Sequence, residues 1–147
     1  MLRNNENNRY TSIDVKTVPL LFRITGIVIF LQLLLGGLLT FNFITPTFHI
    51  ITGIIVFVLA IATMVAALIS KPSFRPLRGL SAGLVALIAV QGILGFATLS
   101  SGSQVLAWIH FLAAMGIYGM AIAGTFMSMA MTRMERNMIA GQGEQKV

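Results

Sequence analysis

The chain has no cysteine, and only four of its 147 residues are acidic. Without cysteine there is no disulfide framework, no thiolate-bound cluster and no covalent haem attachment through a Cys-x-x-Cys-His motif. Charged residues make up 10% of the chain, whereas soluble globular proteins carry about a quarter. Because 56% of the residues are hydrophobic, a domain this small could not hide them from water. The composition therefore predicts a single domain whose solvent is lipid.

Four apolar runs are long enough to cross a bilayer, which takes about 20 helical residues. They cover residues 18–41, 47–70, 79–99 and 105–131. A backbone in lipid must satisfy its own hydrogen bonds, so we expect helices, with Pro46 in the first turn of the second. Short connections predict an all-α membrane protein, an antiparallel bundle of four transmembrane helices. We expect a polar arm over 1–17, the bundle over 18–132 and a tail over 133–147, with arm and tail loosely ordered.

The ten lysines and arginines lie on one side of these spans. They precede or open the first, separate the second from the third, and follow the fourth: Arg3, Arg9, Lys16, Arg23, Lys71, Arg75, Arg78, Arg133, Arg136 and Lys146. This bias predicts a multi-pass protein of the plasma membrane with both termini cytoplasmic. The net charge of +6 then indicates membrane orientation rather than nucleic-acid binding. The first apolar run is too long for the core of a cleavable signal, so we expect none.

The first and third spans share a sequence pattern. LQLLLGGLLT at 31–40 aligns with VQGILGFATL at 90–99, and a histidine follows each stretch near the start of the next span. The matched polar and small residues are Gln32 and Gln91, Gly36 and Gly95, and His49 and His110. The chain is therefore predicted to consist of two repeated helical hairpins.

His49 and His110, the only histidines, are expected at similar depth on helices that are diagonal in a sequentially arranged bundle. Two such imidazoles could bind one haem iron from both sides. Zinc is disfavoured because it needs further ligands, and no span contains a cysteine or a carboxylate. For one histidine alone, hydration or interhelical bonding is the commoner role, but a matched pair favours a functional site. Small neighbours leave room: Gly36, Gly37, Gly53, Gly95, Ala113, Ala114 and Gly116.

The two glutamines are predicted nearer the middle of the bilayer. Hydrogen bonding between helices is the expected role of Gln32 and Gln91, because an amide in hydrocarbon needs a protein partner. Contact with a quinone or with a haem edge is the alternative, which places both residues among the candidate cofactor-binding residues.

LLLGGLLT, the stretch VQGILGFATLSSGSQVLAWIHFLAAMG and the paired histidines resemble the haem A synthase family over about residues 18 to 131. Members usually hold two four-helix halves, and this chain resembles one. The resemblance implies that His49 and His110 bind haem. The catalytic half has a glutamate three residues before its first histidine, where this chain has Pro46, and often an arginine where it has Ile50. The outer-loop cysteine pair is also absent. The chain is thus more similar to the half that holds haem b.

The expected function is that of a membrane b-type cytochrome, with one haem b per chain and no catalytic residue. Its expected partners are the lipid bilayer and other membrane redox subunits or further copies of the chain, with quinol as a candidate electron donor. One alternative is a half-length haem A synthase that oxidises a haem methyl group as an oligomer and binds haem o or haem a. A haem-free structural subunit of a membrane complex is the other.

Overall fold

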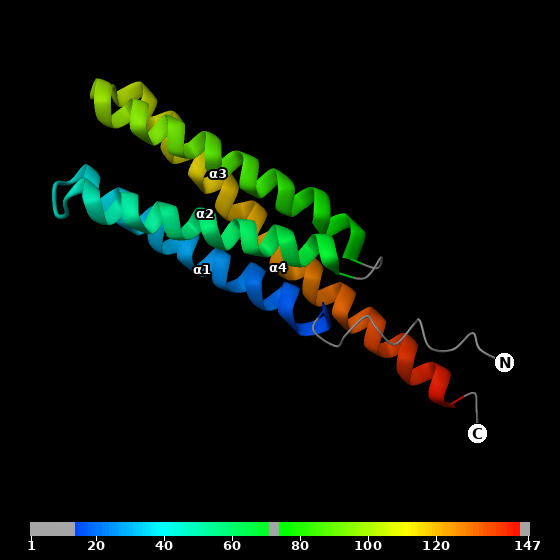
Figure 1. Ribbon diagram of the computed structural model, residues 1–147. Coiled ribbons are helices and arrows are strands. Elements are labelled where there is room, and N and C mark those ends of the chain that lie inside the picture. The colour runs from blue at the N-terminus through cyan, green and yellow to red at the C-terminus, as the bar shows by residue number, and fades with distance from the viewer. Residues whose placement is uncertain (1–13, 71–73, 145–147) are drawn as a thin grey trace.

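The structure, a computed structural model, describes residues 14–70 and 74–144 (Figure 1). This part of the chain forms four helices: α1 (Asp14–Thr40), α2 (Pro46–Ile69), α3 (Arg75–Ser101) and α4 (Gln104–Glu144). By length and composition, each is apolar enough to cross a membrane. The prediction of an all-helical chain with four such helices is confirmed.

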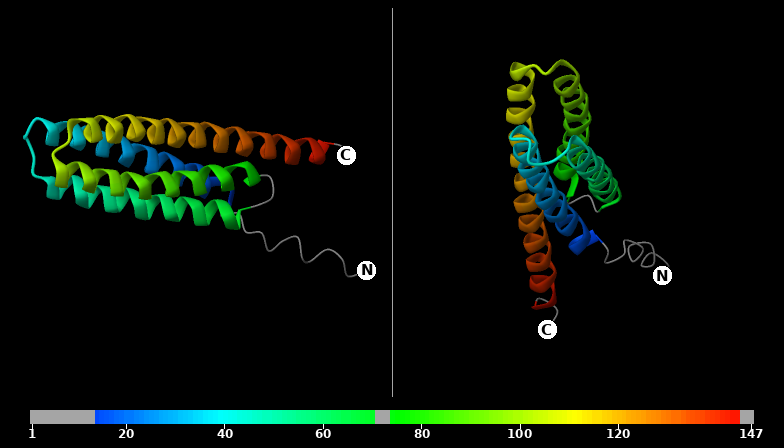
Figure 2. Two further views of the ribbon diagram at one scale, coloured as in Figure 1. Left: turned by 90° about the horizontal axis from the view of Figure 1, so that it is seen from above. Right: turned by 90° about the vertical axis from the view of Figure 1, so that its left-hand side faces the viewer.

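The helices pack against one another in chain order around the bundle. α1 packs on α2, α2 on α3, α3 on α4, and α4 on α1. The loops between α1 and α2 and between α3 and α4 lie at the same end, and α4 projects beyond the other helices at the opposite end (Figures 1 and 2). α2 and α4 are therefore diagonal, as the sequence predicts, and residues near their starts lie at one end of the bundle.

Local sequence explains where the helices begin and end. α2 begins at Pro46, as expected, because the missing N–H of proline costs nothing in a first turn. After α1, Asn42 adopts a left-handed conformation with φ of 60°. α3 ends at Ser101, and the residue after it, Gly102, has φ of 63° and donates its N–H to the Thr98 carbonyl at 3.0 Å. Asparagine and glycine are the residues that tolerate this conformation at a helix end.

The structure corrects the expected order of the tail. Residues 133–144, expected to be loosely ordered, continue α4 as a helix. The segment RMERNMIA contains no proline or glycine and is rich in strong helix formers, so nothing stops the helix where it leaves the apolar span. α1 and α3 likewise begin at Asp14 and Arg75, four residues before the expected spans. The rest of the arm and tail, 1–13 and 145–147, lies outside the described residues.

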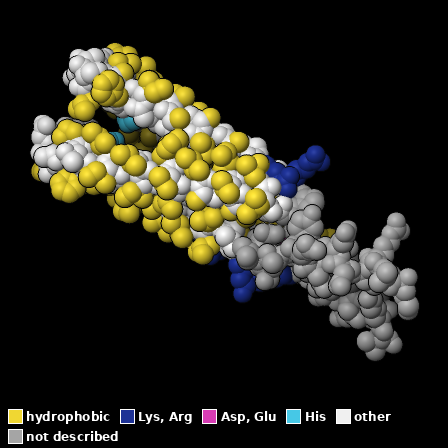
Figure 3. Space-filling view, viewed as in Figure 1, with side chains coloured by type: hydrophobic (Ala, Val, Ile, Leu, Met, Phe, Trp, Pro, Cys, Tyr) yellow, Lys and Arg dark blue, Asp and Glu magenta, His cyan; other side chains and the backbone are white. Residues whose placement is uncertain are grey.

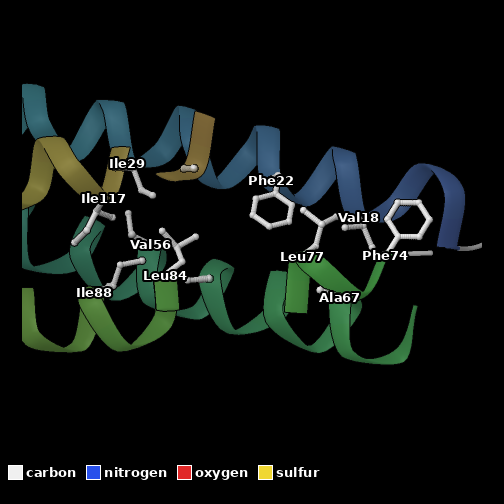
Figure 4. Packing of buried hydrophobic residues seen from close by; sticks show 12 residues of the cluster. Val18, Phe22, Ile29, Val56, Ala67, Phe74, Leu77, Leu84, Ile88 and Ile117 are labelled. Carbon is white, nitrogen blue, oxygen red and sulfur yellow. The ribbon is translucent and has the colours of Figure 1, made fainter. Parts of the chain in front are cut away.

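The tightest packing lies in the half of the bundle away from the α1–α2 loop. Phe22 on α1 is fully buried there, and so are Phe74 and Leu77 at the start of α3 (Figure 4). A buried hydrogen bond of 2.9 Å joins the hydroxyls of Thr25 on α1 and Thr63 on α2. This half therefore fixes the mutual positions of the helices, while apolar side chains cover their outer surface (Figure 3).

Cationic side chains gather at this same end (Figure 3). Arg78 on α3 donates from Nη2 to the Ser70 carbonyl at 2.8 Å and from Nε to the Ala67 carbonyl at 3.3 Å. These carbonyls end α2 and have no partner within the helix. Arg78 therefore caps α2 with a charge that complements the helix dipole.

We predict that Gly124→Ala destabilises the bundle. A Cβ atom at Gly124 on α4 would overlap the ring of Phe22 on α1, which is fully buried. Overpacking of this kind costs about 1–3 kcal/mol. Unfolding of the detergent-purified protein by a denaturing detergent measures the change. Gly119→Ala is the matched control, because a Cβ there meets no atom within 4 Å. Equal stability of the two variants would contradict the close α1–α4 contact.

Candidate functional site

The two histidines approach each other at the end of the bundle that carries the α1–α2 loop. His49 lies in the first turn of α2 and His110 in the second turn of α4. Their ring centres are 6.3 Å apart and their planes are inclined by 74°. Both side chains are half-buried. The predicted pairing of two imidazoles from diagonal helices is therefore present in the structure.

Gln32 on α1 holds His49 at two points. Its Nε2 donates to the His49 carbonyl at 2.9 Å and lies 3.2 Å from the His49 ring nitrogen Nε2. The amide nitrogen carries two hydrogens, so one can serve the carbonyl and the other the ring. In that arrangement His49 Nε2 is the acceptor.

Gln91 on α3 repeats the first of these contacts in the other half of the chain. Its Nε2 donates to the His110 carbonyl at 2.7 Å, and its side chain is buried. Each glutamine thus links one helix to the backbone of the next at the histidine itself. The predicted role of Gln32 and Gln91 in hydrogen bonding between helices is confirmed.

Two glycines make room for the imidazoles. A Cβ atom at Gly36 would lie 3.3 Å from His49 Cε1, and one at Gly95 would lie 3.1 Å from His110 Cε1. Both distances are shorter than ordinary van der Waals contact. All six candidate residues named from the sequence therefore come together as two matching sets, each of one glutamine, one glycine and one histidine.

Gly53 has a different function from the one its sequence position suggested. A Cβ atom there would lie 3.1 Å from Gln32 Nε2. The small residue therefore makes room for the glutamine rather than for a ligand. Gly37 and Gly116 border open space, since a Cβ at either meets no described atom within 4 Å.

Four buried polar atoms of this site have no hydrogen-bond partner among the described residues. They are Nδ1 of His49, Nδ1 of His110, Oε1 of Gln32 and Oε1 of Gln91. Buried polar atoms are nearly always paired, because an unpaired one loses its hydration without compensation. All four atoms belong to the two histidines and the two glutamines described above.

The donor set of the site consists of imidazole nitrogens. Residues 14–70 and 74–144 contain no group of three or more histidine, cysteine, aspartate or glutamate side chains. A haem iron, which the porphyrin already surrounds, needs only one or two axial protein ligands. Figure 3 shows the surface hollowed between the α1–α2 and α3–α4 loops, with histidine atoms visible in the hollow.

Comparison with family models, with curated proteins and with solved structures finds no match for this chain. The functional assignment therefore depends on the residues and the geometry described above.

Proposed function

We propose that this protein is a membrane b-type cytochrome in which His49 and His110 bind one haem. The observation that carries the proposal is the pair of imidazoles, brought together from diagonal helices with ring centres 6.3 Å apart. Each belongs to a matching set with a glutamine and a glycine. A histidine that was only hydrated near the membrane boundary would not require a second imidazole at this distance or the same neighbouring residues in both halves of the chain.

The observed spacing fits two imidazoles on one metal ion. A metal ion lies about 2 Å from a bound imidazole nitrogen. Two imidazoles on opposite sides of one iron therefore have ring centres roughly 6 Å apart. The glycines against both rings, Gly36 beside His49 and Gly95 beside His110, support the same assignment.

The contact between Gln32 and His49 Nε2 bears on which ring nitrogen would bind iron. A neutral imidazole has one lone pair on its acceptor nitrogen, which serves either a hydrogen bond or a metal. Iron bound to His49 Nε2 would replace this 3.2 Å contact, whereas the bond from Gln32 to the His49 carbonyl would be unaffected. The glutamines thus position the helix backbone on which each histidine stands.

The same observations support a finer description of the fold. We infer an antiparallel bundle of two repeated hairpins, α1–α2 and α3–α4, because each pair carries the same glutamine, glycine and histidine contacts. The described cations cluster at the end opposite the histidines (Figure 3). With positive charge facing the cytoplasm of a plasma-membrane protein, the haem would lie near the outer face and both termini inside.

Haem supplies one-electron oxidation and reduction when bound. The residues of the site would bind and orient it, and the histidines, glutamines and glycines that form the site include no carboxylate to move protons. Electron transfer as a subunit of a respiratory or oxidase complex fits this chemistry. Quinol, other membrane redox subunits or a second copy of the chain would then exchange electrons with it.

A second candidate function follows from the resemblance to the haem A synthase family. In an oligomer, half-length chains could together bind one haem as cofactor and haem o or haem a as substrate or product. Pro46, the first residue of α2, stands where the catalytic half of that family has its glutamate. This absence of an acid beside His49 is why we favour electron transfer.

We predict that each histidine is required for haem binding. The purified protein should show a reduced-minus-oxidised spectrum of a low-spin b-type haem, with one haem per chain by the pyridine haemochrome assay. His49→Ala and His110→Ala should each lose this spectrum while circular dichroism shows unchanged helix content. Formation of hydroxylated or formyl haem on expression would instead favour the synthase. Wild-type protein without haem would overturn both functions and leave a structural subunit.

We also predict that Gly95→Ala weakens haem binding while Gly92→Ala does not. A Cβ at Gly95 would press on the His110 ring, whereas one at Gly92, on the same helix, meets nothing within 4 Å. Overpacking costs about 1–3 kcal/mol, so we expect at least about fivefold weaker binding. Titration of the haem-depleted protein with haem gives the two affinities. If both variants bound haem equally, the glycine would have no part in positioning His110.

A further inference from the structure

A cleft between α1 and α4 lies at the end of the bundle opposite the histidines, and the proposed function does not use it. Its volume is about 340 Å³. Four cationic side chains line it, Lys16 and Arg23 from α1 and Arg133 and Arg136 from α4. From the sequence, these residues were interpreted only as the positive charges that orient the chain in the membrane.

These four cations form no ion pair with any carboxylate whose side chain the structure describes. Arg23 instead directs Nη2 to the thioether sulfur of Met129 at 3.1 Å, and a thioether is a weak acceptor. Glu135 is buried and engaged in an interaction of its own, and it does not line the cleft. Like charges held together without counter-charges favour a bound anion.

The arrangement of polar and apolar groups in the cleft indicates an anion with an apolar body. Leu20 and Met129 line the cleft together with the cations. Lys16 and Arg23 are two turns of α1 apart, about 10 Å, so positive charge extends from the helix start into the apolar span. Arginine forks match phosphate oxygens, and basic pockets between transmembrane helices suit phosphate-bearing lipid headgroups.

We propose that this cleft binds the phosphate group of an anionic phospholipid, whose acyl chains continue along α1 and α4. The cations hold the phosphate oxygens, and Leu20 and Met129 contact the apolar part. A free phosphate would use the same cations but would gain nothing from the apolar side chains, which is why the lipid is favoured. The site is independent of haem binding.

Competition binding tests this proposal. The detergent-purified full chain is titrated with a fluorescent phosphatidylglycerol at constant ionic strength. Unlabelled phosphatidylglycerol, phosphatidylcholine or inorganic phosphate then competes. We expect displacement by phosphatidylglycerol and not by phosphatidylcholine. Arg133→Gln should weaken binding about fivefold, the effect of one cation near an anionic headgroup. Arg133→Lys, which keeps the charge but loses the fork, should weaken it less.

Arg75→Gln is the matched control, because Arg75 is also exposed at this end of the bundle but lies outside the cleft. It should bind phosphatidylglycerol as the wild type does. Equal weakening by Arg75→Gln and Arg133→Gln would overturn the proposal, because it would indicate general electrostatic attraction by the cationic end of the bundle. Displacement by phosphatidylcholine would also overturn it. If inorganic phosphate displaced the probe at concentrations similar to those of the lipid, the cleft would be a site for free phosphate, and the proposal of a bound phospholipid would be overturned. Circular dichroism verifies that each variant is folded.

Discussion

Hydrocarbon offers no hydrogen-bond partners, so each polar group inside this bundle depends on another part of the chain. The polar interior is small and arranged accordingly. Thr25 and Thr63 pair with each other between α1 and α2. Gln32 and Gln91 reach across to the carbonyls of His49 and His110. These glutamine bonds join the helices at the points where the imidazoles leave the backbone, and the position of the proposed haem ligands depends on them.

The two ends of the bundle differ in packing and in charge. At the cationic end, buried aromatic and aliphatic side chains such as Phe22 and Leu77 fill the space between helices, and Arg78 caps α2. At the other end the bundle is hollowed, and buried atoms of the histidines and glutamines are unpartnered. A packed half that fixes the helices beside a hollowed half that positions two histidines is the arrangement that the proposed cofactor site requires.

The sequence predicted the features that follow from the length of each apolar run and from the number of residues between a position and the start of its helix. Four apolar runs gave four helices, and equal depth brought His49 and His110 together. Contacts that depend on how each helix is rotated could not be counted in this way. The sequence therefore did not predict that Gly53 makes room for Gln32. It also did not predict that Arg23 and Arg133 line the same cleft. The length of α4 was missed because an apolar pattern marks the membrane boundary and not the helix end.

The most direct test of the account is electron paramagnetic resonance of the oxidised, detergent-purified protein. If His49 and His110 bind one iron from two sides, as their 6.3 Å spacing supports, the spectrum should be that of a low-spin ferric haem with two imidazole ligands. A high-spin signal, which a haem with one protein ligand gives, or a purified protein that binds no haem would contradict the central claim that this pair of histidines forms a single iron site.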